Sequence, residues 1–124
     1  MTVLVDSDIL IEVLRGRDVE ILARWTGLAE SDDVVMYSPV SVAELWHGVR
    51  PKEREALTNL FSALVCVRVE SQTGRQAGEF LQRHHKSHAV ELGDALIAAT
   101  AVQEAAALWT RNRKHYPMAG VRFY

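Results

Sequence analysis

The 124-residue chain lacks the features that mark several specialised classes of protein. It contains one cysteine, Cys66, which excludes an internal disulfide and is typical of a reducing compartment. No apolar run approaches the roughly 20 residues that span a bilayer, and the first residues show no basic segment or cleavage site of a signal peptide. A net charge of −2 excludes a global basic field for nucleic acid. We therefore expect a cytoplasmic protein.

What is present indicates one globular α/β domain. Hydrophobic residues make up 48% and charged residues 24% of the chain, and the length suits a single core over residues 1–124. Short apolar, β-branched runs alternate with segments of helical periodicity. This alternation predicts a central, mostly parallel sheet of four to five strands, flanked by helices.

The element boundaries follow from apolar runs and capping residues. We expect strands at 2–5, 34–37, 65–69, 107–110 and 121–123, and helices at 9–14, 19–28, 42–48, from 51 onward, 70–85 and 95–102. Ser7 or Asp8 is expected to cap the first helix and Ser41 the third. The apolar run around Cys66 predicts that this thiol packs in the core.

The helix at 95–102 is apolar on every side except at Thr100, so it should be buried. Its first turn nevertheless carries Asp94, a residue that is costly to bury without a partner. Two interpretations remain open. Asp94 either caps the helix or stands at the mouth of a site and holds a cation.

Three further polar residues lie where the same edge of the sheet is expected. Asp6 ends the first strand, Glu44 lies in the helix after the second strand, and Asn112 follows the fourth. Ligands of parallel sheets bind outside the carboxyl ends of the strands. Carboxylates gathered there repel one another, and a hard divalent cation such as Mg²⁺ or Mn²⁺ would relieve that repulsion. The pattern favours a metal–phosphate site, although the spacings are too long for a local motif.

Four motifs resemble those of PIN-domain ribonucleases, specifically the VapC toxins of bacterial toxin–antitoxin pairs. They are VLVDSDILI at residues 3–11, SVAEL at 41–45, GDALIAATA at 93–101 and LWTRNRKHY at 108–116. Each motif is loose, but the four occur in the family's order and cover essentially the whole chain.

The resemblance implies a PIN-like fold and a Mg²⁺- or Mn²⁺-dependent endoribonuclease that hydrolyses RNA with a metal-activated water. Its catalytic residues would be Asp6, Glu44, Asp94 and Asn112, with the metal on Asp6, Asp94 and Glu44. Many members carry aspartate at the position of Asn112, so one metal is expected here. The resemblance also implies a homodimer and a small antitoxin whose tail occupies a hydrophobic groove.

Neighbouring residues receive supporting roles in this hypothesis. The hydroxyls of Ser7 and Thr110 would orient the carboxylates. A basic segment follows the fourth strand and would lie along the RNA backbone; it consists of Arg111, Arg113, Lys114 and His115.

Several alternatives stay open from the sequence. Asp8 suits either helix capping or membership of the acidic site, Glu91 favours the surface, and Glu12 is expected on the wet side of its helix. The Asp6-Ser7-Asp8 run also resembles the opening of haloacid-dehalogenase-like phosphatases, in which Asp6 would be the nucleophile. The absence of an acid at position 98 and the short chain weigh against that enzyme. A non-catalytic PIN-like binding module is a further alternative.

Overall fold

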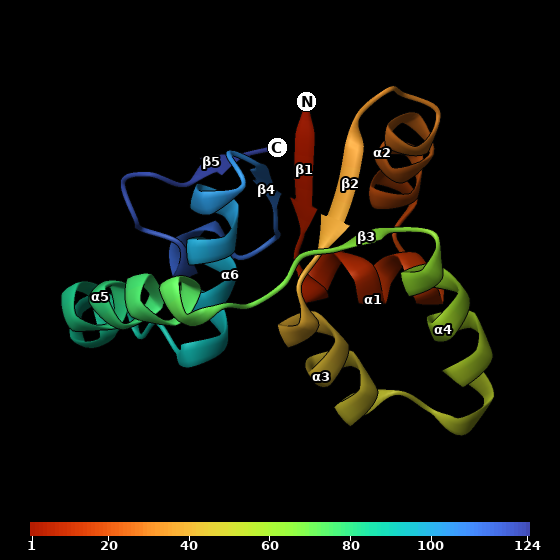
Figure 1. Ribbon diagram of the computed structural model, residues 1–124. Helices are drawn as coiled ribbons and strands as arrows, with labels where there is room; N and C mark the ends of the chain where they lie inside the picture. The colour runs from red at the N-terminus through yellow and green to blue at the C-terminus, as the bar shows by residue number, and fades with distance from the viewer.

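The computed structural model describes all residues from Met1 to Tyr124 and shows a three-layer α/β arrangement (Figure 1). The strands are β1 (Thr2–Val5), β2 (Val34–Tyr37), β3 (Val65–Cys66), β4 (Ala107–Trp109) and β5 (Arg122–Phe123). The α-helices are α1 (Ser7–Arg15), α2 (Val19–Ala29), α3 (Pro39–Gly48), α4 (Arg54–Ser62), α5 (Ser71–His88) and α6 (Leu92–Gln103). Two short 3₁₀ helices, η1 (Pro51–Glu53) and η2 (Arg113–His115), complete the chain.

The sheet confirms the predicted parallel topology. Its strand order is β3-β2-β1-β4-β5, and every neighbouring pair is parallel. β1 is central and pairs with β2 on one side and β4 on the other. Because all strands run the same way, their carboxyl ends share one edge. That edge places the end of β1 beside the end of β4.

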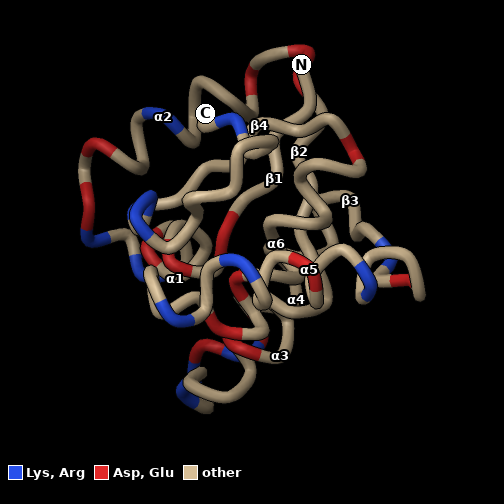
Figure 2. The backbone as a smooth tube through the Cα atoms, turned by 90° about the vertical axis from the view of Figure 1, so that its left-hand side faces the viewer, with Lys and Arg blue, Asp and Glu red and all other residues tan.

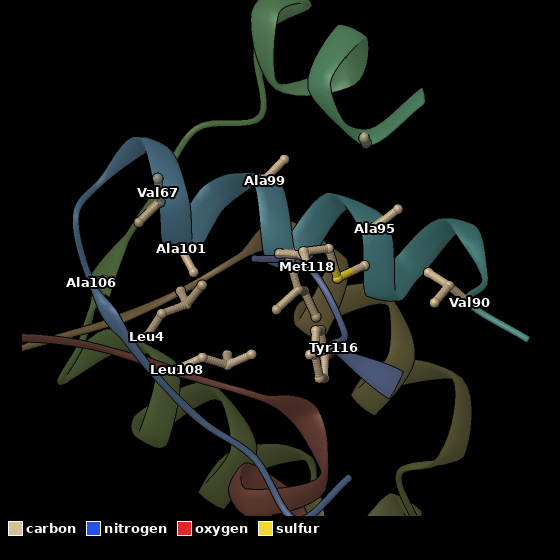
Figure 3. Packing of buried hydrophobic residues seen from close by; sticks show 13 residues of the cluster. Leu4, Val67, Val90, Ala95, Ala99, Ala101, Ala106, Leu108, Tyr116 and Met118 are labelled. Atoms are coloured by element: carbon tan, nitrogen blue, oxygen red, sulfur yellow. The ribbon is translucent and has the colours of Figure 1, made fainter. Parts of the chain in front are cut away.

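Alternation along the strands divides the core into two clusters on opposite faces. Leu4 and Leu108 pack under α6, together with its alanines and with Tyr116 and Met118, and α5 covers the other side of α6 (Figure 3). Val3, Val5 and Trp109 face the other layer, which α1, α2 and α4 supply. The prediction of a buried α6 is confirmed, because Ala95 and residues 97–101 are all buried. Thr100 satisfies its hydroxyl by donating to the Leu96 carbonyl at 2.8 Å.

The ends of the helices differ from the sequence-based boundaries. Asp6, rather than Ser7 or Asp8, is the N-cap of α1. Ser38 caps α3, which Pro39 begins, so Ser41 is a buried residue inside the helix and not its cap. Proline suits a first helical position because it lacks the N–H that would be unpaired there.

The structure also corrects the expected burial of Cys66 and the expected end of α5. The third strand is only two residues long and lies at the sheet edge, so Cys66 is exposed rather than packed in the core. Helix α5 runs through to His88 and ends at Ala89, whose φ of 51° is left-handed. No helix combines the length and the apolar character that crossing a membrane requires.

Candidate active site

Asp6 lies at the carboxyl end of the central strand and is buried, with 7% of its surface exposed. Its Oδ1 accepts the backbone N–H of Ser7 at 2.8 Å. Its Oδ2 accepts two hydroxyls, those of Thr110 and Tyr116, each at 2.8 Å. A carboxylate offers about four acceptor positions. Three are therefore used, and one position on Oδ1 remains for a ligand.

Tyr116 is a site residue that the sequence analysis missed. Burial and the adjacent charge of Asp6 raise the pKa of its phenol, so Tyr116 stays protonated and donates to Asp6. Tyr116 is the last residue of the fourth motif, but the sequence assigns it no role, because an aromatic next to Pro117 and Met118 is most simply a core anchor. Only the return of the chain beside β1 brings its hydroxyl to Asp6.

Glu44 and the first turn of α6 lie against each other. The Ser7 hydroxyl donates to Glu44 Oε1 at 2.8 Å and also lies 2.8 Å from the Ser41 hydroxyl. A Cβ built on Gly93 would stand 3.6 Å from Glu44 Oε2. The predicted role of Ser7 in orienting a carboxylate is thus consistent with its contact, and Glu44 keeps Oε2 free of hydrogen bonds.

Asp94 is not the N-cap of α6, because Glu91 occupies that position. Asp94 instead stands at the third helical position, where its Oδ2 accepts the Glu91 backbone N–H at 3.1 Å. The same Oδ2 lies 3.7 Å from Nδ1 of His115. Asp94 therefore accepts an N–H at the start of the helix without being its N-cap, and its role as a cation ligand stays a prediction.

The acidic groups influence one another electrostatically. Burial raises the pKa of Glu44, and the charges of Asp6 and Asp94 raise it further. Burial also raises the pKa of Asp94, and the charge of Asp6 adds to the effect. Figure 2 shows the same crowding, with acidic segments gathered below the lower end of β1 and basic ones on the surrounding loops. Negative charge is in excess here.

Asp8 joins this cluster instead of capping a helix. Its Oδ2 accepts the backbone N–H of Arg111 at 2.9 Å, while its Oδ1 is buried without any hydrogen-bond partner. Burial, followed by the charge of Asp6, raises the pKa of Asp8 to about 6. A buried carboxylate oxygen without a donor is costly.

The side-chain atoms that could coordinate a metal fit a hard divalent cation. All are oxygens, and three of them have acceptor capacity left over: Oδ1 of Asp6, the unpartnered Oδ1 of Asp8 and Oε2 of Glu44. No three His, Cys, Asp or Glu side chains form a ready cage. Mg²⁺ does not require one, since it commonly binds through one or two carboxylates and keeps several waters.

The basic segment after β4 is divided among different contacts. The Arg111 guanidinium lies 3.4 Å from the Glu12 carboxylate. Glu12 is buried, so the expectation that it lies on the wet side of α1 is wrong. Arg113 stacks over Phe123 at 4.9 Å, on the side of β5. Lys114 is exposed, and His115 faces Asp94. The Asn112 backbone N–H donates to Thr110 Oγ1 at 3.1 Å, and its side chain makes no hydrogen bond.

Comparison with known proteins agrees with this geometry. The model of the PIN domain family matches residues 3–121. The chain belongs to the PIN-domain family. Ribonuclease VapC10 of Mycobacterium tuberculosis is 39% identical over 117 residues, which cover 94% of this chain and 86% of that protein. Ribonuclease VapC19 of the same organism is 36% identical over 116 residues, covering 93% and 92%.

These identities place the PIN domain among the VapC ribonucleases, as the four motifs had indicated. Solved structures show the same fold at lower identity. VapBC from Salmonella typhimurium bound to DNA matches with a TM-score of 0.81 and 18% identity, over 100% of this chain and 97% of that one. VapBC2 from Rickettsia felis, bound to a DNA fragment from the promoter, matches with a TM-score of 0.80 and 20% identity. The match covers 100% of this chain and 98% of that one. Membership of this family excludes the dehalogenase-like phosphatase.

Replacing Tyr116 by phenylalanine tests its contact with Asp6. We expect Tyr116→Phe to lower the free energy of unfolding by about 1.5–3 kcal/mol, because a buried carboxylate loses a donor. Tyr124→Phe is the matched control, since the Tyr124 hydroxyl makes no hydrogen bond, and it should stay within about 0.5 kcal/mol. Urea unfolding measures both. Equal stability of the two variants would show that the Tyr116 hydroxyl does not support Asp6.

The raised pKa of Asp8 predicts a pH-dependent effect of Asp8→Asn. The pKa of Asp8 is about 6 in the folded chain and near 3.8 when unfolded, so the folded state holds the proton more tightly. As the pH rises from 4 to above 6, wild type loses stability that the asparagine variant keeps. In the presence of chelator, Asp8→Asn should have a higher free energy of unfolding than wild type at pH 7, and this difference should shrink as the pH falls to 4. A stability difference between Asp8→Asn and wild type that does not change between pH 4 and pH 7 would contradict the assignment.

Proposed function

We propose that this protein is a metal-dependent endoribonuclease that acts as the toxin of a toxin–antitoxin pair. The proposal rests on the convergence of three acids: Asp6 just after β1, Glu44 on α3 and Asp94 on α6. Sequence identity to the VapC ribonucleases supports RNA as the substrate. Asp6, Glu44 and Asp94 would hold a single Mg²⁺ or Mn²⁺.

Each residue has a role that follows from its contacts. A bound cation supplies positive charge for the phosphorane-like transition state and makes a water more acidic. Asp6 is held rigid by three donors, so its remaining oxygen position is fixed. Glu44 has a raised pKa and one oxygen, Oε2, without a hydrogen bond; this oxygen either binds the cation or accepts the proton of the attacking water. The water oxygen then bonds to phosphorus as the bond to the leaving ribose oxygen breaks, and that oxygen takes a proton from solvent water.

The basic side chains would guide the RNA past this negatively charged centre. Lys114 is free to meet a phosphate, and His115 can reach one from beside Asp94. Arg113 is turned towards Phe123, so we assign it to a more distant part of the RNA path. Asn112 adds an oxygen but no charge, which favours one metal over two.

Cleavage of total cellular RNA by the purified protein tests the activity. With Mg²⁺ or Mn²⁺ we expect discrete cuts, located by sequencing the RNA ends, that disappear in chelator. Asp94→Asn should lower the cutting rate at least about a hundredfold, because it removes a ligand charge while keeping an oxygen for the Glu91 N–H. Asp32→Asn, which changes an exposed acid elsewhere, should cut like wild type.

Two outcomes would overturn this proposal. Cuts that persist in chelator and in Asp94→Asn would mean that the acidic site is not the nuclease. A folded wild-type protein that cuts nothing with either metal would favour the non-catalytic binding module instead.

The partner we propose is a small antitoxin, as in the structures named for toxin–antitoxin complexes. A cleft of about 500 Å³ between α2, α4 and the start of β2 suits an apolar segment of such a protein. Nine of its ten lining residues are hydrophobic, among them Trp25, Leu60 and Leu64. The expected homodimer stays a prediction.

Growth measurements with the cognate antitoxin test this cleft. Expression of the chain should arrest growth, and the antitoxin should relieve the arrest. Ala63→Glu places a charge at the exposed rim of the cleft without removing core contacts, so it should block relief while leaving RNA cleavage intact. Thr58→Glu, on α4 but outside the cleft, is the control. Full relief of the Ala63→Glu variant would exclude the cleft as the binding site.

A further inference from the structure

Glu12 is a buried acid that binds two half-exposed arginines. It lies on α1 with 8% of its surface exposed, although glutamate is almost never buried unless paired. Its Oε1 stands 2.8 Å from Arg17 Nη2 and 3.4 Å from Arg111 Nη1. The Arg17 and Arg111 side chains are 57% and 51% exposed. One carboxylate between two guanidiniums leaves this cluster with a net positive charge.

Arg111 is held by α1 at both of its ends. Its backbone N–H donates to Asp8 at 2.9 Å, and its guanidinium pairs with Glu12. Asp8 and Glu12 are four residues apart, so they occupy the same face of the helix. The residue before Arg111 is Thr110, whose hydroxyl donates to Asp6. The arginine is therefore anchored directly beside the acidic centre.

This placement meets a need that the acidic centre creates. Its carboxylates repel RNA phosphates, and an arginine beside them offsets that repulsion. A guanidinium has five N–H donors in a rigid fork, so pairing with one carboxylate oxygen leaves donors for a phosphate. Holding the long side chain in place beforehand reduces the entropy lost when RNA binds.

We propose that Glu12 is a positioning residue that holds the Arg111 guanidinium at the edge of the active site, where it binds an RNA phosphate. The inference rests on the proposed ribonuclease function. It assigns to Glu12 a role in binding RNA through Arg111, without contact to the RNA itself.

Removing the charge of Glu12 shows whether this carboxylate helps RNA binding by positioning Arg111 or hinders it by its negative charge. In the Asp94→Asn protein with Mg²⁺, binding of a fluorescent single-stranded RNA of mixed sequence is followed by anisotropy at several salt concentrations. Glu12→Gln removes a negative charge, so simple electrostatics predicts tighter binding. Loss of positioning predicts binding about two- to fivefold weaker. Glu79→Gln, whose partner is Arg75 on α5, shows the effect of charge removal alone.

Two further variants separate positioning from a structural role. Glu12→Asp keeps the charge on a shorter arm and should weaken binding similarly. Arg111→Ala should weaken RNA binding. It should also make the slope of log K against log salt concentration shallower by about 0.7, the value for one phosphate contact on a single strand. In the Arg111→Ala protein, Glu12→Gln should have no further effect, whereas damage to the fold would weaken binding in both backgrounds alike.

The outcomes tell the two proposals apart. Tighter or unchanged binding by Glu12→Gln, or equal weakening with and without Arg111, would overturn the role of Glu12 while leaving the ribonuclease proposal standing. A folded parent protein that binds no RNA at any salt concentration would overturn both.

Discussion

The burial of the Asp6 carboxylate at the end of the central strand is the constraint on which the rest of the site depends. A buried carboxylate is tolerated only with hydrogen-bond donors around it. Here the donors come from the next residue, Ser7, and from the far end of the chain, Thr110 and Tyr116. The pairing of β1 with β4 is therefore a requirement of the chemistry as well as of the sheet.

Around Asp6 the chain accumulates more negative charge than its own donors neutralise. Glu44, Asp94 and Asp8 all have raised pKa values, each with burial as the largest cause. A site arranged only for stability would not leave Oδ1 of Asp8 buried without a partner. The same excess accounts for the affinity that we infer for a divalent cation, and for the arginine held at the rim by Glu12.

Much of the fold was predictable because it follows from local patterns. Apolar runs marked the strands, and the all-round apolar stretch of α6 marked it as the buried helix. The errors lie where a tertiary contact decides. Cys66 is exposed because its strand is at the sheet edge, and Glu12 is buried where its carboxylate pairs with two arginines from outside its helix. The local sequence pattern does not indicate that β3 lies at the sheet edge or that arginines from outside α1 lie beside Glu12.

For the active site, the sequence by itself determined the residue types and their places at the strand ends and helix starts. Asp6 and Asp94 could be named because each adjoins a buried segment, and Glu44 because it lies in the helix that follows the second strand. Only the tertiary structure decided which oxygens are occupied and which are free. The hydroxyl of Tyr116 and the backbone N–H of Arg111 reach their carboxylates across more than 100 residues of chain. Such contacts depend on how the strands are ordered in the sheet, which local spacing does not encode.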